Sequence, residues 1–269
     1  MAFTALMEQC YGSGMRDTDF AGDPDASRQT INEWAKENTR GKIKELLPPQ
    51  SIDGRTRIVI VNAIFFQGKW NQQFDKLKTR EDDFALATDR TVRVPMMVQS
   101  AAHIRHADAS TFSLIELSYT GGRWCMVFLL PKKRCGLREV ETLLTGAMLN
   151  DALADLKSVE RTIVIPRFKM NWNVGLKPAL VGMGMPTAFS SAANFSGMIE
   201  NTQLLIDDVI HGASIEVDES GTIAAAATAV KFRETAGPAP YRLDQPFIAL
   251  VRDNHTGTIA FMTRVSDPR

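Results

Sequence analysis

Polar and hydrophobic positions first follow a helical period near the start of the chain. Ile31, Trp34 and Ala35 form an apolar stripe at helical spacing. Asp23 and Pro24, just before the stripe, are a typical helix cap and first helical residue. The pattern predicts a helix that begins here and is stopped by the proline pair at 48–49.

Later in the chain the pattern changes to that of strands. The run from Arg57 to Phe66 is almost continuously apolar, which predicts a central strand buried on both faces. Near the end, Phe247 to Val251 and Thr258 to Val265 flank a polar, glycine-containing turn, which predicts a hairpin with both strands in the core. The chain shows no linker, repeat or low-complexity segment, so these elements indicate one mixed α+β domain.

The segment Glu216 to Val230, EVDESGTIAAAATAV, supports two interpretations. Helix propensity favours an exposed alanine-rich helix capped by Asp218 or Ser220. Alternation with a period of two instead fits a loop that can become a strand, because one face is free of charge and the charges gather on the other. The uncharged face carries Thr222, Ala224, Ala226, Thr228, Val230 and Phe232, and the other carries Ile223, Ala225, Ala227, Ala229, Lys231 and Arg233.

Several segments in fixed order carry a resemblance to a known family. They are RQTINEWAKENTRGKIKELLPP, RIVIVNAIFFQGKWNQQF, VRVPMM, WCMVFLLPKK, RTIVIPRFKM, DDVIHGASIEVDESGTIAAAATAV and QPFIALVRDNHTGTIAFMTRVSDP. From about Tyr11 to Pro268 the chain resembles the serpins, which are inhibitors of serine proteases. The NAIFFQGKW segment and the alanine-rich segment are the most specific of these motifs.

The resemblance implies the serpin fold, with a large mixed β-sheet A, further β-sheets and surrounding helices. It implies a single serpin domain over residues 1–269, partial because roughly the N-terminal third of the family pattern is absent, with a reactive-centre loop at about 219–240. The implied function is inhibition of a serine protease as a suicide substrate, whose loop inserts into the main sheet after cleavage. The alternative is a non-inhibitory serpin-like binding protein, or a truncated inactive serpin that behaves as a protease substrate.

The resemblance also assigns roles to residues of the loop. Its hinge corresponds to Glu219, Gly221, Thr222, Ile223, Ala224, Ala225, Ala226, Ala227 and Thr228. Counting inward from both ends of the loop places the scissile bond between Thr235 and Ala236, which suits a protease with a shallow, elastase-like specificity pocket. Arg233 is the rival position and would favour a trypsin-like protease. From Gly221 onward the loop is expected to be an exposed tether.

Two polar residues stand within apolar surroundings, Asn62 and His211, and buried polar groups require hydrogen-bond partners. They can be two separately satisfied residues. The resemblance instead matches them to the family's shutter, where hydrogen bonding beneath the main sheet governs its opening. Trp70 matches the aromatic residue at the breach, where insertion begins, although an ordinary core tryptophan has the same sequence signature.

Charge and composition narrow the range of partners. The chain has 31 basic and 31 acidic residues, which gives no reason to expect nucleic acid or a membrane as a partner. Cys10, Cys125 and Cys135 are an odd number and define no disulfide framework. The four histidines accompany no recognised catalytic motif, so we expect no enzyme activity, no cofactor and no metal. The resemblance implies a secreted, extracellular monomer that regulates proteolysis negatively through a covalent acyl complex with its target protease.

Overall fold

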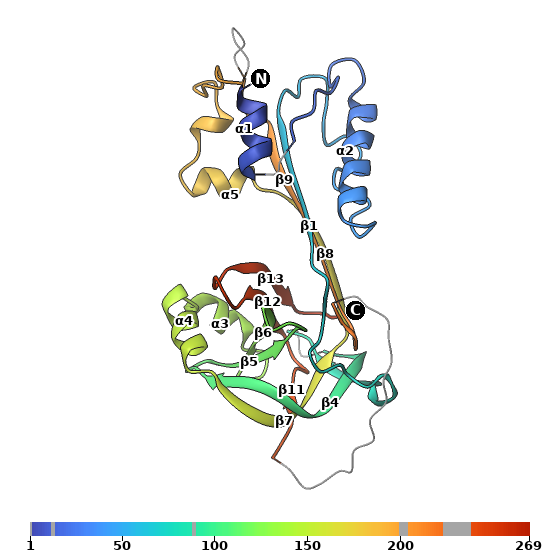
Figure 1. The fold of residues 1–269 in the computed structure, drawn as a ribbon, viewed down its shortest axis with the longest axis vertical. Helices are drawn as coiled ribbons and strands as arrows, with labels where there is room; N and C mark the ends of the chain where they lie inside the picture. Colours follow the sequence, from blue (N-terminus) through green and yellow to red (C-terminus); the bar gives the residue numbers. More distant parts are fainter. Residues whose placement is uncertain (1, 12–13, 88–89, 199–203, 223–237) are drawn as a thin grey trace. The chain divides into compact units, whose positions relative to one another are not determined.

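The computed structural model describes residues 2–11, 14–87, 90–198, 204–222 and 238–269. The chain divides into two compact units, one formed by residues 1–65 and 171–214 and the other by residues 66–170 and 215–269. Figure 1 labels the elements in chain order. They are α1 (Ala2–Tyr11), α2 (Pro24–Asn38), β1 (Val59–Phe65), β2 (Gly68–Lys69), η1 (Lys76–Lys78), β3 (Arg80–Ala85), β4 (Thr91–Asp108), β5 (Phe112–Ser118), β6 (Trp124–Pro131), α3 (Leu137–Leu143), α4 (Gly146–Ala154), β7 (Lys157–Pro166), β8 (Phe168–Gly175), α5 (Lys177–Gly182), η2 (Thr187–Phe189), β9 (Asp208–Val217), β10 (Gly221–Thr222), β11 (Tyr241–Arg242), β12 (Phe247–Asp253) and β13 (Ile259–Val265).

Helix α2 begins as the sequence predicts but ends earlier. The Asp23 side chain accepts a hydrogen bond from the Ala26 amide, and Pro24 is the first helical residue. The helix ends at Asn38 rather than at the proline pair, because the chain turns into left-handed backbone at Arg40 and Gly41. The predicted end was therefore wrong by about ten residues.

The first unit is built on a three-stranded sheet with the order β1-β9-β8. Helix α2 packs on this sheet, where Trp34 and Ala35 meet Val61 and Ile210 (Figure 1). Strands β1 and β9 are parallel, and β1 has β9 as its one strand neighbour among the described residues. The prediction of a central strand buried on both faces was wrong: β1 lies at an edge, and Ile60 is 44% exposed. An apolar run shows that a segment is hydrophobic, but it does not show how many strands lie beside that segment in the sheet.

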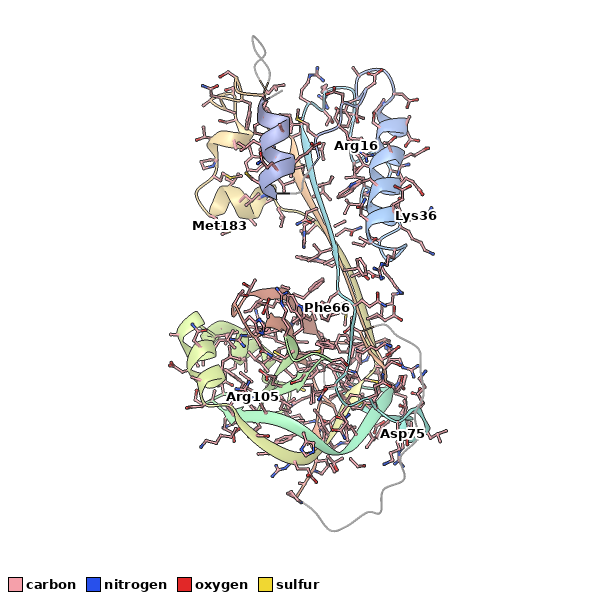
Figure 2. The ribbon with its side chains drawn as sticks, in the orientation of Figure 1. Arg16, Lys36, Phe66, Asp75, Arg105 and Met183 are labelled. Carbon is pink, nitrogen blue, oxygen red and sulfur yellow. The ribbon has the colours of Figure 1, made fainter. Side chains whose placement is uncertain are left out.

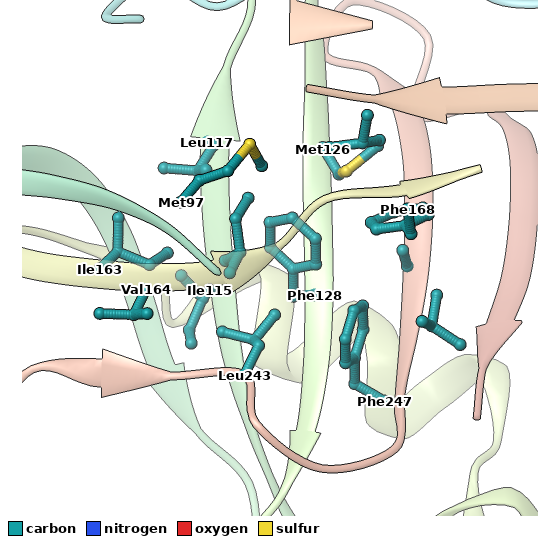
Figure 3. Packing of buried hydrophobic residues seen from close by; sticks show 14 of the residues in the cluster. Met97, Ile115, Leu117, Met126, Phe128, Ile163, Val164, Phe168, Leu243 and Phe247 are labelled. Carbon is teal, nitrogen blue, oxygen red and sulfur yellow. The ribbon is translucent and has the colours of Figure 1, made fainter. Parts of the chain in front are cut away.

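The second unit is built on an eight-stranded sheet in which β11, β7, β4, β5, β6, β12 and β13 follow one another and β3 pairs with β4. One face of this sheet carries the main core, in which Phe128, Phe168 and Phe247 pack edge to face (Figure 3). Helices α3 and α4 cover the other face through Val140 and Leu149 (Figure 1).

The predicted hairpin is present as β12 and β13, which are antiparallel from Phe247 opposite Val265 onward. Strand β12 lies between β6 and β13 and is buried along most of its length. Strand β13 is an edge strand of the described sheet, and Met262 is 59% exposed, so the expectation that both strands lie in the core holds for β12 alone.

Candidate functional site

The predicted loop begins with a short antiparallel ladder in the second unit. Gly221 pairs with Lys69, and Thr222 pairs with Gly68. Gly221 has a φ of +144°, and a Cβ atom there would meet the Gly68 carbonyl oxygen and lie 2.8 Å from the Trp70 amide nitrogen. Only glycine accommodates both the backbone conformation and the close approach.

An aromatic pair lies against this ladder. The rings of Trp70 and Tyr119 stack with their centroids 4.6 Å apart, and both residues are buried. The Trp70 indole Nε1 donates to the Asp218 carbonyl at 3.0 Å, and the Tyr119 hydroxyl lies 2.8 Å from Thr222 Oγ1. Burial raises the pKa of Tyr119 far above its usual range, so this hydroxyl stays protonated and keeps its hydrogen bond. The pair therefore holds Asp218 and Thr222, on either side of Gly221, in place.

Glu219 is the charged centre of the site. Its side chain is 2% exposed, and its Oε1 accepts from Thr79 Oγ1 at 2.7 Å and from Arg167 Nη2 at 2.5 Å. Its carbonyl oxygen accepts from the Phe74 amide at 2.8 Å. Burial raises the pKa of the Glu219 carboxyl, but the hydrogen bonds from Thr79 and Arg167 outweigh it and hold the pKa below its ordinary value. The carboxylate is therefore charged and paired at neutral pH.

The structure places part of the predicted hinge and corrects one expectation. Glu219, Gly221 and Thr222 lie together at the ladder, with Trp70 beside them. Gly221 and Thr222 are buried, so the prediction of an exposed tether from Gly221 onward was wrong for these two residues, because the ladder and Tyr119 cover them. The remaining hinge positions and the proposed scissile bond lie outside the described residues: Ile223, Ala224, Ala225, Ala226, Ala227, Thr228, Arg233, Thr235 and Ala236.

Sequence reasoning missed Tyr119, Thr79 and Arg167 as members of the site. They come from the end of β5, from the turn before β3 and from the residue before β8, which are far apart in the sequence. A short local motif carries no signal for such long-range contacts. The ion pair between Arg167 and Glu219 becomes apparent only in the folded chain, because the two residues are 52 positions apart in the sequence.

Asn62 and His211 occupy directly opposite positions on the paired strands β1 and β9. The expectation that both are buried was wrong, because Asn62 is exposed and His211 is partly buried against the edge of the Trp172 ring. The described hydrogen bonds include none between their side chains. Burial lowers the pKa of His211, which is therefore neutral at pH 7.

The described chain resumes after the loop shortly before the two-residue strand β11, which pairs with β7 and is also held by side-chain contacts. Arg242 donates to Asp82 at 2.7 Å and to Asp244 at 3.2 Å. The Tyr241 ring is contacted by Arg161, 4.7 Å from its centroid, and by the ring of His106, also at 4.7 Å. These contacts anchor the chain where it re-enters the sheet.

His106 makes this anchor sensitive to acid. Burial lowers its pKa, Asp108 at 3.7 Å opposes that effect, and the cations Arg161 and Lys132 add to it. Its Nε2 atom has no hydrogen-bond partner within the described residues. Since the folded pKa lies below the unfolded value of about 6.5, the unfolded chain binds more protons between the two values, and the anchor loses stability as pH falls through that interval.

We therefore expect hydrogen exchange of the amides of residues 241–243, corrected for the intrinsic rate, to be faster at pH 5.5 than at pH 7.5. The variant His106→Phe keeps an aromatic ring against Tyr241 and should lose most of this pH dependence. The control His211→Phe, in the other unit, should leave it unchanged. Equal pH dependence in His106→Phe and the unaltered protein would contradict the assignment.

In the part of the chain that the structure describes, no group of three or more histidine, cysteine or acidic residues could hold a metal ion. None of the described helices is long and apolar enough to cross a membrane.

Comparison with known proteins shows which family shares this sequence and fold. The family model described as serpin (serine protease inhibitor) matches residues 1–268. The chain belongs to the serpin family. Among serpins, Iris of Ixodes ricinus is 34% identical over 271 residues, which are 98% of this chain and 72% of Iris. The leukocyte elastase inhibitor of Sus scrofa is 35% identical over 275 residues, covering 99% of this chain and 73% of that protein.

Solved serpin structures confirm the predicted fold. The structure of thyroxine-binding globulin in complex with thyroxine matches with a TM-score of 0.89 and 28% identity, covering 99% of this chain and 71% of that one. The sequence-based identification of the family and of the serpin fold is therefore confirmed, and the site at the loop base belongs to a serpin.

Proposed function

We propose that this serpin inhibits a serine protease as a suicide substrate. The observation that carries the proposal is the loop base: Gly221 and Thr222 already pair with β2, Glu219 in the preceding turn is held by Thr79 and Arg167, and the sequence beyond them continues the uncharged face of a strand. A segment already paired at its first two residues can extend its ladder with no charged side chain to bury on that face. The likeness to the leukocyte elastase inhibitor agrees with this function.

The proposed chemistry is that of the protease. Its serine oxygen attacks the carbonyl carbon of Thr235, the protease histidine passes the serine proton to the leaving nitrogen of Ala236, and an ester joins the serine to Thr235. Strand extension from Thr222 onward would then compete with hydrolysis of that ester by water. Trp70 would act at the breach and Asn62 with His211 at the shutter. The small residue before the bond favours an elastase-like protease, and Arg233 leaves a trypsin-like protease as the rival.

The test is incubation with an elastase-like and with a trypsin-like protease, followed by denaturing electrophoresis and mass analysis. We expect a complex that survives denaturation and a released peptide that begins at Ala236. A peptide that begins at Glu234 would move the bond to Arg233 and keep the mechanism. Rapid cleavage without any complex would overturn the inhibitory proposal.

A variant sharpens this test. Thr222 is fully buried beside Tyr119 and already pairs with Gly68, so Thr222→Arg would place a charge at the point from which the ladder must extend. We expect the variant to be cleaved at the same bond while the yield of complex falls at least tenfold. The matched control Thr91→Arg, at an exposed position of β4, should keep the yield of the unaltered protein. Unchanged complex formation by Thr222→Arg would contradict insertion through this position.

A second candidate is a serpin that binds a ligand and inhibits no protease. The observation in its favour is the structural likeness to thyroxine-binding globulin in complex with thyroxine. It is distinguished by the same incubation, since it yields cleaved chain without a stable complex. The inhibitory proposal also includes an extracellular site of action and a monomeric state, which detection in the medium of the producing cells and light scattering would test.

A further inference from the structure

Two segments of the chain match the acceptor pattern for N-linked sugars, which is an asparagine, any residue except proline, and then a serine or threonine. They are Asn194-Phe195-Ser196 and Asn254-His255-Thr256. Short patterns of this kind also arise by chance, so the sequence alone does not choose between the two segments. The surroundings of the two asparagine side chains differ in the structure, and this difference distinguishes them.

Asn194 lies in the segment of the first unit that links α5 to β9, just after the short turn η2. Figure 2 labels Met183 at the start of this segment. Asn194 and Ser196 are both exposed, and the Ser196 amide donates to Asn194 Oδ1 at 3.1 Å. The Asn194 Nδ2 atom has no hydrogen-bond partner among the described residues. This nitrogen is therefore accessible from the solvent and free to react.

The Asn254 side chain is instead engaged through both of its polar atoms. Its Nδ2 donates to the Gly122 carbonyl at 2.9 Å, and its Oδ1 accepts from Cys125 Sγ and from Arg252 Nη1, each at 3.2 Å. Gly122 lies in the turn before β6 and Cys125 lies in β6, whereas Asn254 lies in the turn between β12 and β13. The Asn254 amide therefore links two turns of the second unit and is a structural contact.

We infer that Asn194, and not Asn254, carries an N-linked oligosaccharide when the folded chain is secreted. This inference rests on the extracellular site of action in the proposed function. Sugar transfer can precede folding, so the folded structure matters through what it accommodates. On Asn194 a sugar extends into water and leaves the hydrogen bond from the Ser196 amide intact. On Asn254 a sugar would crowd the Gly122 carbonyl and weaken the link between the two turns, so chains modified there would fold poorly.

The reaction is a substitution at the first sugar of a lipid diphosphate oligosaccharide, which the secretory pathway supplies together with the transferase. Asn194 Nδ2 forms a bond to the anomeric carbon, while the bond from that carbon to the diphosphate oxygen breaks and the lipid diphosphate leaves with the bonding electrons. Nδ2 loses one proton to a basic group of the transferase and keeps the other. Ser196 supplies the hydroxyl group that the acceptor pattern requires.

The experiment directs the full chain into the secretory pathway of eukaryotic cells with an added leader and compares it with the chain made without a leader. Intact masses are measured before and after treatment with peptide N-glycosidase, and peptide mapping locates the asparagine that this enzyme converts to aspartate. We expect an oligosaccharide at Asn194 of the secreted chain and none without the leader. Ser196→Ala should abolish the modification with Asn194 still in place, and Ser196→Thr should retain it. The matched control Thr256→Ala removes the other acceptor pattern and should leave the modification unchanged.

An unmodified Asn194 in the folded chain from the medium would overturn the inference, and so would an oligosaccharide on Asn254 of that chain. If the chain is retained inside the cells, the fraction that resists limited proteolysis is mapped instead, and the same two results overturn the inference. No protease inhibition enters these measurements, so they are separate from the test of the proposed function. A modified Asn194 in a chain that forms no protease complex would support the acceptor site and overturn the inhibitory function alone.

Discussion

Gly221→Ala is expected to destabilise the protein by about 3 kcal/mol, because it combines backbone strain at a positive φ with overpacking against the next strand. The added methyl group would meet the Gly68 carbonyl oxygen and the Lys69 Cα, which are backbone atoms and cannot rotate away. The ladder between β10 and β2 would open, and the Trp70 indole would lose its fixed position. Urea unfolding of the purified variant measures the loss of stability.

Gly146→Ala is the matched control for this experiment. Gly146 is the first residue of α4, its φ is not in the left-handed region, and a Cβ atom there would meet nothing within 4 Å. Alanine has the higher helix propensity, so this variant should be as stable as the unaltered protein or slightly more stable. If Gly221→Ala proves as stable as Gly146→Ala, the close approach at the loop base is not essential to the fold.

Arg167→Met is expected to cost about 2 to 3 kcal/mol, because it leaves the buried Glu219 carboxylate with Thr79 as its remaining side-chain donor. The value lies at the lower end for a broken buried pair, since 46% of the Arg167 side chain is exposed and water can partly replace it. Arg167→Lys keeps the charge and should recover part of the loss. Urea unfolding at pH 7 measures the free energy of unfolding of the unaltered protein, Arg167→Met and Arg167→Lys.

A matched control is Lys169→Met, two residues further along. Lys169 pairs with Glu216 at 3.6 Å, but half of its side chain is exposed, so its removal should cost less than about 1 kcal/mol.

The pH dependence of stability gives a second check on the pairing of Arg167 with Glu219. The pKa of Glu219 is lowered on folding, so its contribution is complete above about pH 4.5 and is lost as pH falls through the folded value. Arg167→Met should show a smaller loss over that acid range, and an equal loss would contradict the pairing.

The sequence predicted the elements that depend on local chemistry. The start of α2 follows from a cap and a proline that act within one turn, and the hairpin of β12 and β13 follows from two strand-like runs around a polar turn. The end of α2 was missed because left-handed backbone at Arg40 and Gly41 stops the helix before the prolines are reached. The edge position of β1 was missed because apolar composition does not specify how many strands lie beside it.

For the site, the sequence by itself determined the family and the charge-free alternation of the loop, and it predicted that Gly221 belongs to the hinge and Trp70 to the breach. Those features depend on residue types at fixed spacings, because spacing along a chain determines which side chains share a face. Only the tertiary structure decided that Glu219 pairs with Arg167 and Thr79, that Thr222 meets Tyr119, and that Asn62 is exposed. The physical reason is that burial and charge pairing arise between strands distant in the sequence, and their partners exist only once the sheet is assembled.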